Sequence, residues 1–214
     1  MSLMEIPASG RVRVAYEAAL RELQTLGIEE TAKAELSRSI AWEVSSAFAT
    51  GPGSFPAVDF GDTGQRDLTA ENTAATVLGE NYDEVHPVAG SSISLAITAA
   101  WTAVAAWEDW RVSPQRYRRP GQRDALVNAG RWFGGILNEQ RISEFTQGRV
   151  TFVGEYDRKK YEVAEAYFTI PDGDAVQMSL GDWIVCEEGR WFVLTDGVFR
   201  DRYVLDSVFP GSRS

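Results

Sequence analysis

The chain has 214 residues, a formal net charge of −10 at pH 7 and a sequence pI near 4.7. An acidic surface does not attract phosphate backbones, so these totals argue against nucleic-acid binding over the whole surface. The single cysteine, Cys186, excludes an internal disulfide and fits a reducing cytoplasm.

The N-terminal part predicts two antiparallel helices joined near residues 27–28. Residues 11–26 carry apolar side chains at helical spacing, and Gly27 stands where a left-handed glycine would close the first helix. Residues 29–50 predict the second helix, with an apolar side chain at every fourth position, and the Gly-Pro-Gly run at 51–53 ends it. This half therefore begins with a helical hairpin.

Residues 54–66 predict a loop that leads to a short helix ending near Gly79. The acidic side chains of this loop lack the spacing and the distal glutamate of a calcium site. A connector is expected at residues 81–89, which contain His86, the only histidine. One histidine does not supply a histidine-based metal site or a Ser-His-Asp triad without other groups, so we assign no metal ligands and no catalytic residues.

Residues 91–111 predict a helix that is apolar on almost every side and forms the centre of the fold. Ile93, Ile97, Trp101 and Val104 follow a helical seam, and alanines cover a second side. Such a helix is buried either by protein or by lipid. Its apolar core, residues 93–107, is shorter than the ~20 residues of a membrane span, so we expect a buried helix and no membrane association.

Charge is distributed unevenly along the chain. Residues 1–109 contain 6 basic and 16 acidic side chains, residues 110–145 contain 7 and 3, and residues 146–214 contain 8 and 12, giving −10, +4 and −4. The basic segment opens with clustered arginines and a tyrosine, which we take as candidates for binding an anion or a partner: Arg111, Arg116, Tyr117, Arg118, Arg119 and Arg123. The same arginines are also suited to pair with the acidic first half of the chain or of a neighbouring subunit.

A long helix is predicted at residues 124–145, and the period changes after Gly148. From there, short alternating segments are separated by Gly and Asp turns, which favours a small antiparallel sheet or barrel. Residues 187–190 predict a tight hairpin turn, and Trp183, Val185, Trp191 and Val193 are expected on one face. The predicted fold is α+β, with a helical domain at 1–147 and a small β domain at 148–214 packed on it.

About 35 C-terminal residues resemble a short module of phage and prophage proteins. The likeness lies in the run Gly181-Asp182-Trp183-Ile184-Val185, in Gly189, in Trp191-Phe192, and in Phe199 and Tyr203. The module normally begins Pro-Gly-Asp-Trp-Ile-Val, whereas Leu180 stands at the proline position here. The resemblance implies a phage-associated origin, and it transfers no catalytic residue and no cofactor to this chain.

These features favour a non-enzymatic protein of a phage or prophage that binds another protein or itself, located in the host cytoplasm or in the virion. A virion structural component, such as a head–tail connector or minor capsid protein, is the first alternative. A small-molecule or nucleotide-binding protein, or an enzyme, that uses the arginines between Arg111 and Arg123 is the second. As a nucleophile, Cys186 would need an activating neighbour, and the only imidazole lies a hundred residues away.

Overall fold

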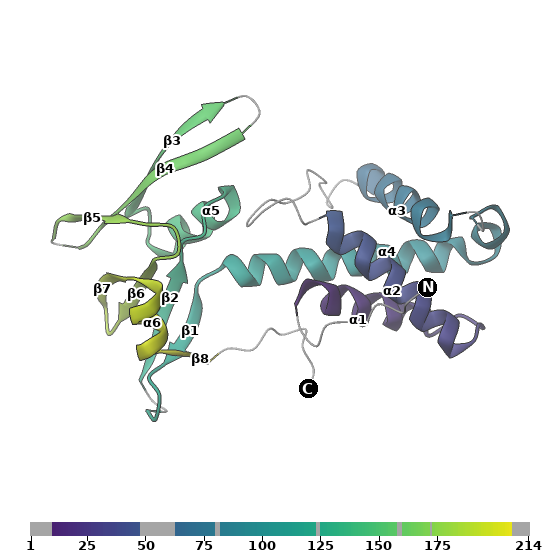
Figure 1. Ribbon diagram of the computed structural model, residues 1–214, viewed down its shortest axis with the longest axis horizontal. Coiled ribbons are helices and arrows are strands. Elements are labelled where there is room, and N and C mark those ends of the chain that lie inside the picture. The colour runs from purple at the N-terminus through teal and green to yellow at the C-terminus, as the bar shows by residue number, and fades with distance from the viewer. Residues whose placement is uncertain are drawn as a thin grey trace. The chain divides into compact units, whose positions relative to one another are not determined.

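The computed structural model describes residues 10–47, 63–79, 82–122, 125–157, 160–171 and 173–206. Within these ranges the chain forms six helices and two antiparallel sheets, which confirms the predicted α+β class (Figure 1). The chain divides into two compact units between Glu108 and Asp109. We call the described residues up to Glu108 the helical unit and those from Asp109 the sheet unit.

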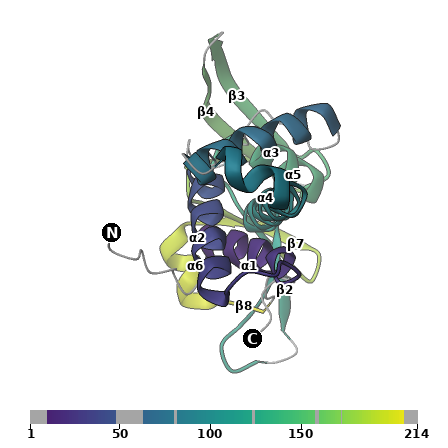
Figure 2. The same ribbon diagram turned by 90° about the vertical axis from the view of Figure 1, so that its right-hand side faces the viewer.

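The helical unit contains α1 (Arg11–Leu23), α2 (Glu30–Ala47), α3 (Thr63–Leu78) and most of α4 (Tyr82–Val112). Figures 1 and 2 show α1, α2 and α3 lying around α4. Ile93, Ile97, Trp101 and Val104 of α4 share one buried cluster with small and branched side chains of the other three helices. The predicted central helix is therefore present, and its apolar seam is buried by protein.

Three boundaries differ from those expected. Helix α1 ends at Leu23, and Gly27 does not adopt a positive φ. Helix α3 begins at Thr63, inside the predicted loop. Helix α4 begins at Tyr82, so the predicted connector at 81–89 is wrong: Pro87 lies in the second turn, where it removes one backbone donor without ending the helix. Residues 48–62, which include Phe48 and most of the predicted loop, lie outside the described residues.

The segment Gly90–Val112 is long and apolar enough to cross a membrane by length and composition. This corrects the expectation that its apolar stretch is too short for a span. The core helix of a soluble protein passes the same test, and the buried seam of α4 packs within the cluster described above. The absence of membrane association thus stays a prediction.

The sheet unit is built on two open antiparallel sheets, not a closed barrel. The larger has the order β7-β6-β2-β1-β8 and the smaller the order β3-β4-β5. The strands of the larger sheet are β1 (Gln115–Arg118), β2 (Leu126–Arg131), β6 (Trp183–Glu187), β7 (Arg190–Leu194) and β8 (Val204–Leu205). Those of the smaller are β3 (Val150–Asp157), β4 (Lys160–Thr169) and β5 (Ala175–Met178), and two helices complete the unit, α5 (Ile136–Phe145) and α6 (Asp196–Arg202).

The predicted long helix at 124–145 is wrong over its first half. Residues Leu126–Arg131 form β2, which pairs with β1 on one side and β6 on the other, and helix begins only at Ile136. Gly134 and Gly135 take φ values of 75° and 89°, which break any helical path between the two elements. Because β1 and β2 pair with strands from beyond Gly148, the compact units divide at Glu108 and not at the change of sequence period.

The two faces of the five-stranded sheet support separate clusters. Trp183 and Val185 of β6 pack with Phe199 and Tyr203 on one face. Trp191 and Val193 of β7 pack on the opposite face, with Ile142 of α5 and residues of the smaller sheet, so the expectation of a single shared face is wrong. The hairpin register explains the difference, because the odd-numbered residues of β6 lie opposite even-numbered residues of β7.

The tight turn at residues 187–190 is confirmed. Glu187 lies opposite Arg190, and the two residues between them have positive φ, 51° at Glu188 and 79° at Gly189. Two successive positive φ values are those of the type I′ turn, whose twist matches that of paired strands. This two-residue loop also fixes the register that separates Trp183 from Trp191.

Candidate partner-binding surface

The predicted arginines lie on and around β1, which runs between β2 and the short edge strand β8. Directly opposite residues of neighbouring strands share a face, and Arg118 is paired with Leu126 of β2 and with Val204 of β8. Arg116 is paired with Asn128 two positions along the same face. The structure therefore brings two of the predicted arginines together on one side of the sheet, beside two apolar side chains.

Two members of the arginine cluster form ion pairs with carboxylates of the sheet unit itself. Arg119 Nη2 donates to Glu187 Oε2 at 2.8 Å, whereas Arg118 Nε lies 3.5 Å from Asp206 Oδ1 and makes no hydrogen bond to it. The Glu187 hydrogen bond and charge raise the pKa of Arg119 above its ordinary value. These partners lie in the segment after Gly148, not in the acidic first half of the chain.

Tyr117 packs against the core and is partly buried. Its ring meets Trp183 and Phe199 edge-on, with centroids 5.3 and 4.9 Å apart. Burial raises the pKa of Tyr117 to about 12, and Arg131 opposes the shift. The structure thus places this candidate as a packing residue of the cluster beneath α6.

The remaining candidates are separated. The guanidinium of Arg111, at the end of α4, lies 5.5 Å from the centre of the Phe133 ring. Arg116 is exposed, and no ion pair joins its side chain to another residue that the structure describes. Arg123 falls outside the described residues.

Arg131 is a cation that the sequence did not single out, because its segment reads as helix. Its guanidinium lies over Phe133 and Trp183, at 5.0 and 5.7 Å, and its Nε donates to the Gly181 carbonyl at 3.1 Å. It also pairs with Asp196, which accepts a hydrogen bond from Trp183 Nε1 at 2.9 Å. That hydrogen bond, with smaller contributions from arginine neighbours, lowers the pKa of Asp196.

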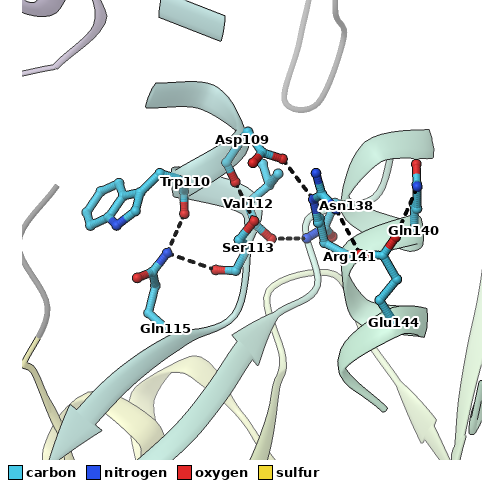
Figure 3. Close-up of polar contacts among 9 residues, drawn as sticks. All are labelled: Asp109, Trp110, Val112, Ser113, Gln115, Asn138, Gln140, Arg141 and Glu144. Atoms are coloured by element: carbon cyan, nitrogen blue, oxygen red, sulfur yellow. Dashed lines mark hydrogen bonds and ion pairs between the residues drawn. The ribbon is translucent and has the colours of Figure 1, made fainter. Parts of the chain in front are cut away.

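Asn138 of α5 fixes the point where α4 passes into β1. Its side chain is fully buried, accepts from the Phe133 N–H at 2.6 Å, and donates to the carbonyls of Val112 and Arg131 at 3.1 and 3.0 Å. It therefore connects the end of α4 and the end of β2 with its own helix, α5 (Figure 3). No sequence motif marks this residue.

Charged and polar side chains around Asn138 complete the junction (Figure 3). Arg141 donates to Asp109 and Glu144, both at 2.8 Å, which raises the pKa of Arg141. Gln115, the first residue of β1, donates from Nε2 to the carbonyls of Trp110 and Ser113. These bonds close the last turn of α4 and set where β1, with its arginines, begins.

One part of the five-stranded sheet stays open to solvent. On the face away from α6, the β6–β7 half is covered by Ile142, Phe145 and the smaller sheet. The described side chains of the β1–β8 half of this face are exposed or partly exposed, and we call these residues the open sheet face: Arg116, Arg118, Leu126, Asn128 and Val204. Leu126 and Val204 are 38% and 40% exposed, although both are apolar.

Comparison with family models, with curated proteins and with solved structures finds no match for this chain. Within the described ranges, no group of three or more His, Cys, Asp or Glu residues is placed to hold a metal ion. The chemical character of the open sheet face is thus the main guide to function. It offers one exposed cation beside exposed apolar groups, a composition found at protein–protein contacts.

Proposed function

We propose that this chain is a non-enzymatic accessory protein of a phage or prophage that acts by binding another protein. The phage origin rests on the likeness of its C-terminal residues to the phage module, and the mode of action rests on the open sheet face. On that face the apolar side chains of Leu126 and Val204 are exposed to water, and Arg116 carries a positive charge beside them. A protein surface with an apolar centre and a neighbouring carboxylate is complementary to this face.

The intramolecular ion pairs favour this reading over small-anion binding by the arginine cluster. A nucleotide phosphate at Arg118 and Arg119 would compete with the carboxylates of Asp206 and Glu187 for these two guanidinium groups. A protein partner can meet Arg116, Leu126 and Val204 without breaking either pair. We place the protein in the host cytoplasm, where such a partner would be met.

Affinity capture from host lysate with matched variants tests the proposal. Leu126→Glu puts a charge on the open sheet face, whereas Leu180→Glu puts the same charge on a side chain that is 65% exposed in a turn of the same unit. We expect a specific host protein to be retained by the wild type and by Leu180→Glu and lost by Leu126→Glu. Equal retention by all three proteins, or no specific protein, would contradict the proposal.

Light scattering separates the accessory protein from a virion component. An accessory protein is expected to remain a 23.7 kDa monomer at two protein concentrations and two salt levels. A ring of defined size that dissociates with salt would instead favour a head–tail connector or capsid component, since salt screens contacts between oppositely charged segments.

A further inference from the structure

Strand β7 forms one edge of the five-stranded sheet, at the opposite end from β8 and the open sheet face (Figure 1). Natural sheet edges are usually protected by charged side chains, by proline, by a bulge or by a very short strand. Strand β8 has only two residues, and β3 has a bulge after Val153. Strand β7 has five residues, pairs with β6 without a register shift, and carries its single charge, Arg190, at the turn. Its outer edge therefore lacks these protecting features.

The pairing of β6 shows which backbone groups of β7 face outward. The Trp132 N–H donates to the Asp182 carbonyl at 2.9 Å, so even-numbered residues along β6 direct their backbone groups toward β2 and odd-numbered ones toward β7. The odd-numbered residues of β6 lie opposite even-numbered residues of β7, which leaves the N–H and C=O groups of Trp191 and Val193 on the outer edge. No other group in the described ranges forms a hydrogen bond with them.

Apolar side chains border this outer edge on both faces of the sheet. Trp191 and Val193 pack against the cluster that contains Ile142, and the two alternate residues pack against the cluster beneath α6. All four side chains are only partly buried: Trp191, Phe192, Val193 and Leu194. Free backbone groups between two partly exposed apolar borders are the features to which an extended chain adds as a further strand.

Two cations lie beside β7, one on each face. Arg190 is exposed, and the guanidinium of Arg149 lies 5.8 Å from the centre of the Trp191 ring. In the part of the chain that the structure describes, neither arginine forms an ion pair, because Glu187, which lies opposite Arg190, is held by another arginine. Glu188 on the turn offsets only one of the two charges, so this edge keeps a net positive charge.

We propose that β7 binds an extended segment of a partner protein as a sixth strand, and that this segment carries carboxylates among apolar side chains. Its main chain would bond to the outward groups of Trp191 and Val193, its apolar side chains would cover the two borders, and its carboxylates would pair with Arg149 and Arg190. A second copy of β7 is disfavoured, because it would bring two more cations to the same edge. The site does not rest on the proposed function.

Amide hydrogen exchange of the 15N-labelled full chain, followed residue by residue, tests the strand addition. In the free protein we expect the Trp191 and Val193 amides to exchange fast and those of Phe192 and Leu194 slowly, because only the latter are bonded to β6. The probes are short random peptides that are selected on the immobilised full chain and then synthesised. An enriched peptide should slow the two fast amides, and enriched sequences should combine alternating apolar residues with Asp or Glu.

Matched variants locate the bound peptide. Arg190→Glu should weaken its binding roughly threefold or more, whereas Arg116→Glu makes the same charge change on the open sheet face and should leave it unchanged. Val193→Pro removes one outward donor and no bond to β6, and should weaken binding roughly fivefold.

Four results would overturn the proposal. They are the absence of any enriched peptide, enrichment without Asp or Glu, and binding that is lost in Arg116→Glu but kept in Arg190→Glu, which would assign the peptide to the open sheet face. The fourth is a dimer in light scattering whose Trp191 and Val193 amides are already protected without peptide, because β7 would then be occupied by a second copy.

Discussion

At the scale of single residues, the buried side chain of Asn138 forms three hydrogen bonds that stabilise the sheet unit. Asn138→Ala would leave the Phe133 N–H and the Val112 and Arg131 carbonyls without their side-chain partner. We expect a loss of about 3 kcal/mol or more in unfolding free energy, because buried polar groups without partners each destabilise by about 1–3 kcal/mol. Urea denaturation measures it, and Gln140→Ala, on an exposed residue of the same helix, should change stability by less than about 0.5 kcal/mol.

The raised pKa of Tyr117 predicts that the sheet unit loses stability at alkaline pH. Its pKa is about 12 in the folded chain against an ordinary value of 10.0. A raised pKa favours the neutral phenol, so the stabilisation is fully present below pH 10 and is lost as pH rises from 10 to 12. Over that window the wild type should lose stability relative to Tyr117→Phe, which keeps the ring and has no proton to release. The loss should stay below the limit of about 1.4 kcal/mol per pH unit, because the ring is partly exposed to solvent. Parallel pH profiles of the two proteins would contradict the assignment.

At the scale of elements, burial of one side of α4 stabilises this helix within the helical unit. Trp101 is 4% exposed and belongs to the buried cluster of the helical unit, whereas Leu95, less than two turns away, is 60% exposed. We expect Trp101→Ala to destabilise by roughly 3–5 kcal/mol and Leu95→Ala by less than about 1 kcal/mol. Thermal melting of both variants measures the difference. Equal shifts in melting temperature would mean that α4 is not buried on one particular side.

The sequence predicted residues 91–111 of this helix but not its first turns, and it assigned the segment after the helix wrongly, for a physical reason. Apolar spacing in α4 fits only a helix, because the seam continues for several turns. In residues 126–133 the apolar positions fit a helix and a strand almost equally, and the choice is made by pairing with β6, more than fifty residues later. Packing of α5 adds a second distant constraint: a Cβ added at Gly130 would lie 2.6 Å from Ile142 Cδ1 of α5, a close approach that the local sequence does not predict.

For the candidate surface too, the sequence predicted the features that depend on neighbouring residues and not those that depend on distant strands. The clustering of arginines near β1 was evident from the sequence, and the structure places Arg116 and Arg118 on one face of the sheet. Their carboxylate partners, Asp206 and Glu187, were not predictable, because they depend on strand order. Residues 110–214 contain 15 basic and 15 acidic side chains, so the positive and negative segments fold into one nearly neutral unit, and the net charge of −10 belongs to residues 1–109.

At the scale of the whole molecule, the two units have separate cores and should respond separately to damage. Trp101 belongs to the cluster of the helical unit, and the residues beside Asn138 belong to the clusters of the sheet unit. We expect Trp101→Ala to speed amide hydrogen exchange in α1 and α2 and to leave β2 and β6 unchanged. Asn138→Ala should speed amide hydrogen exchange in β2 and β6 and leave α1 and α2 unchanged. Mass spectrometry of peptides from each element measures the exchange in both variants.

The two variants also serve as each other's controls. If both loosened all elements to the same degree, the chain would unfold as one cooperative body, and the division at Glu108 would be geometric only. If the effects stay separate, a partner bound at the open sheet face stabilises the sheet unit alone, because binding protects only the unit whose native state it selects. Hydrogen exchange in the presence of a captured partner would then locate the contact on the sheet unit, whatever protein that partner is.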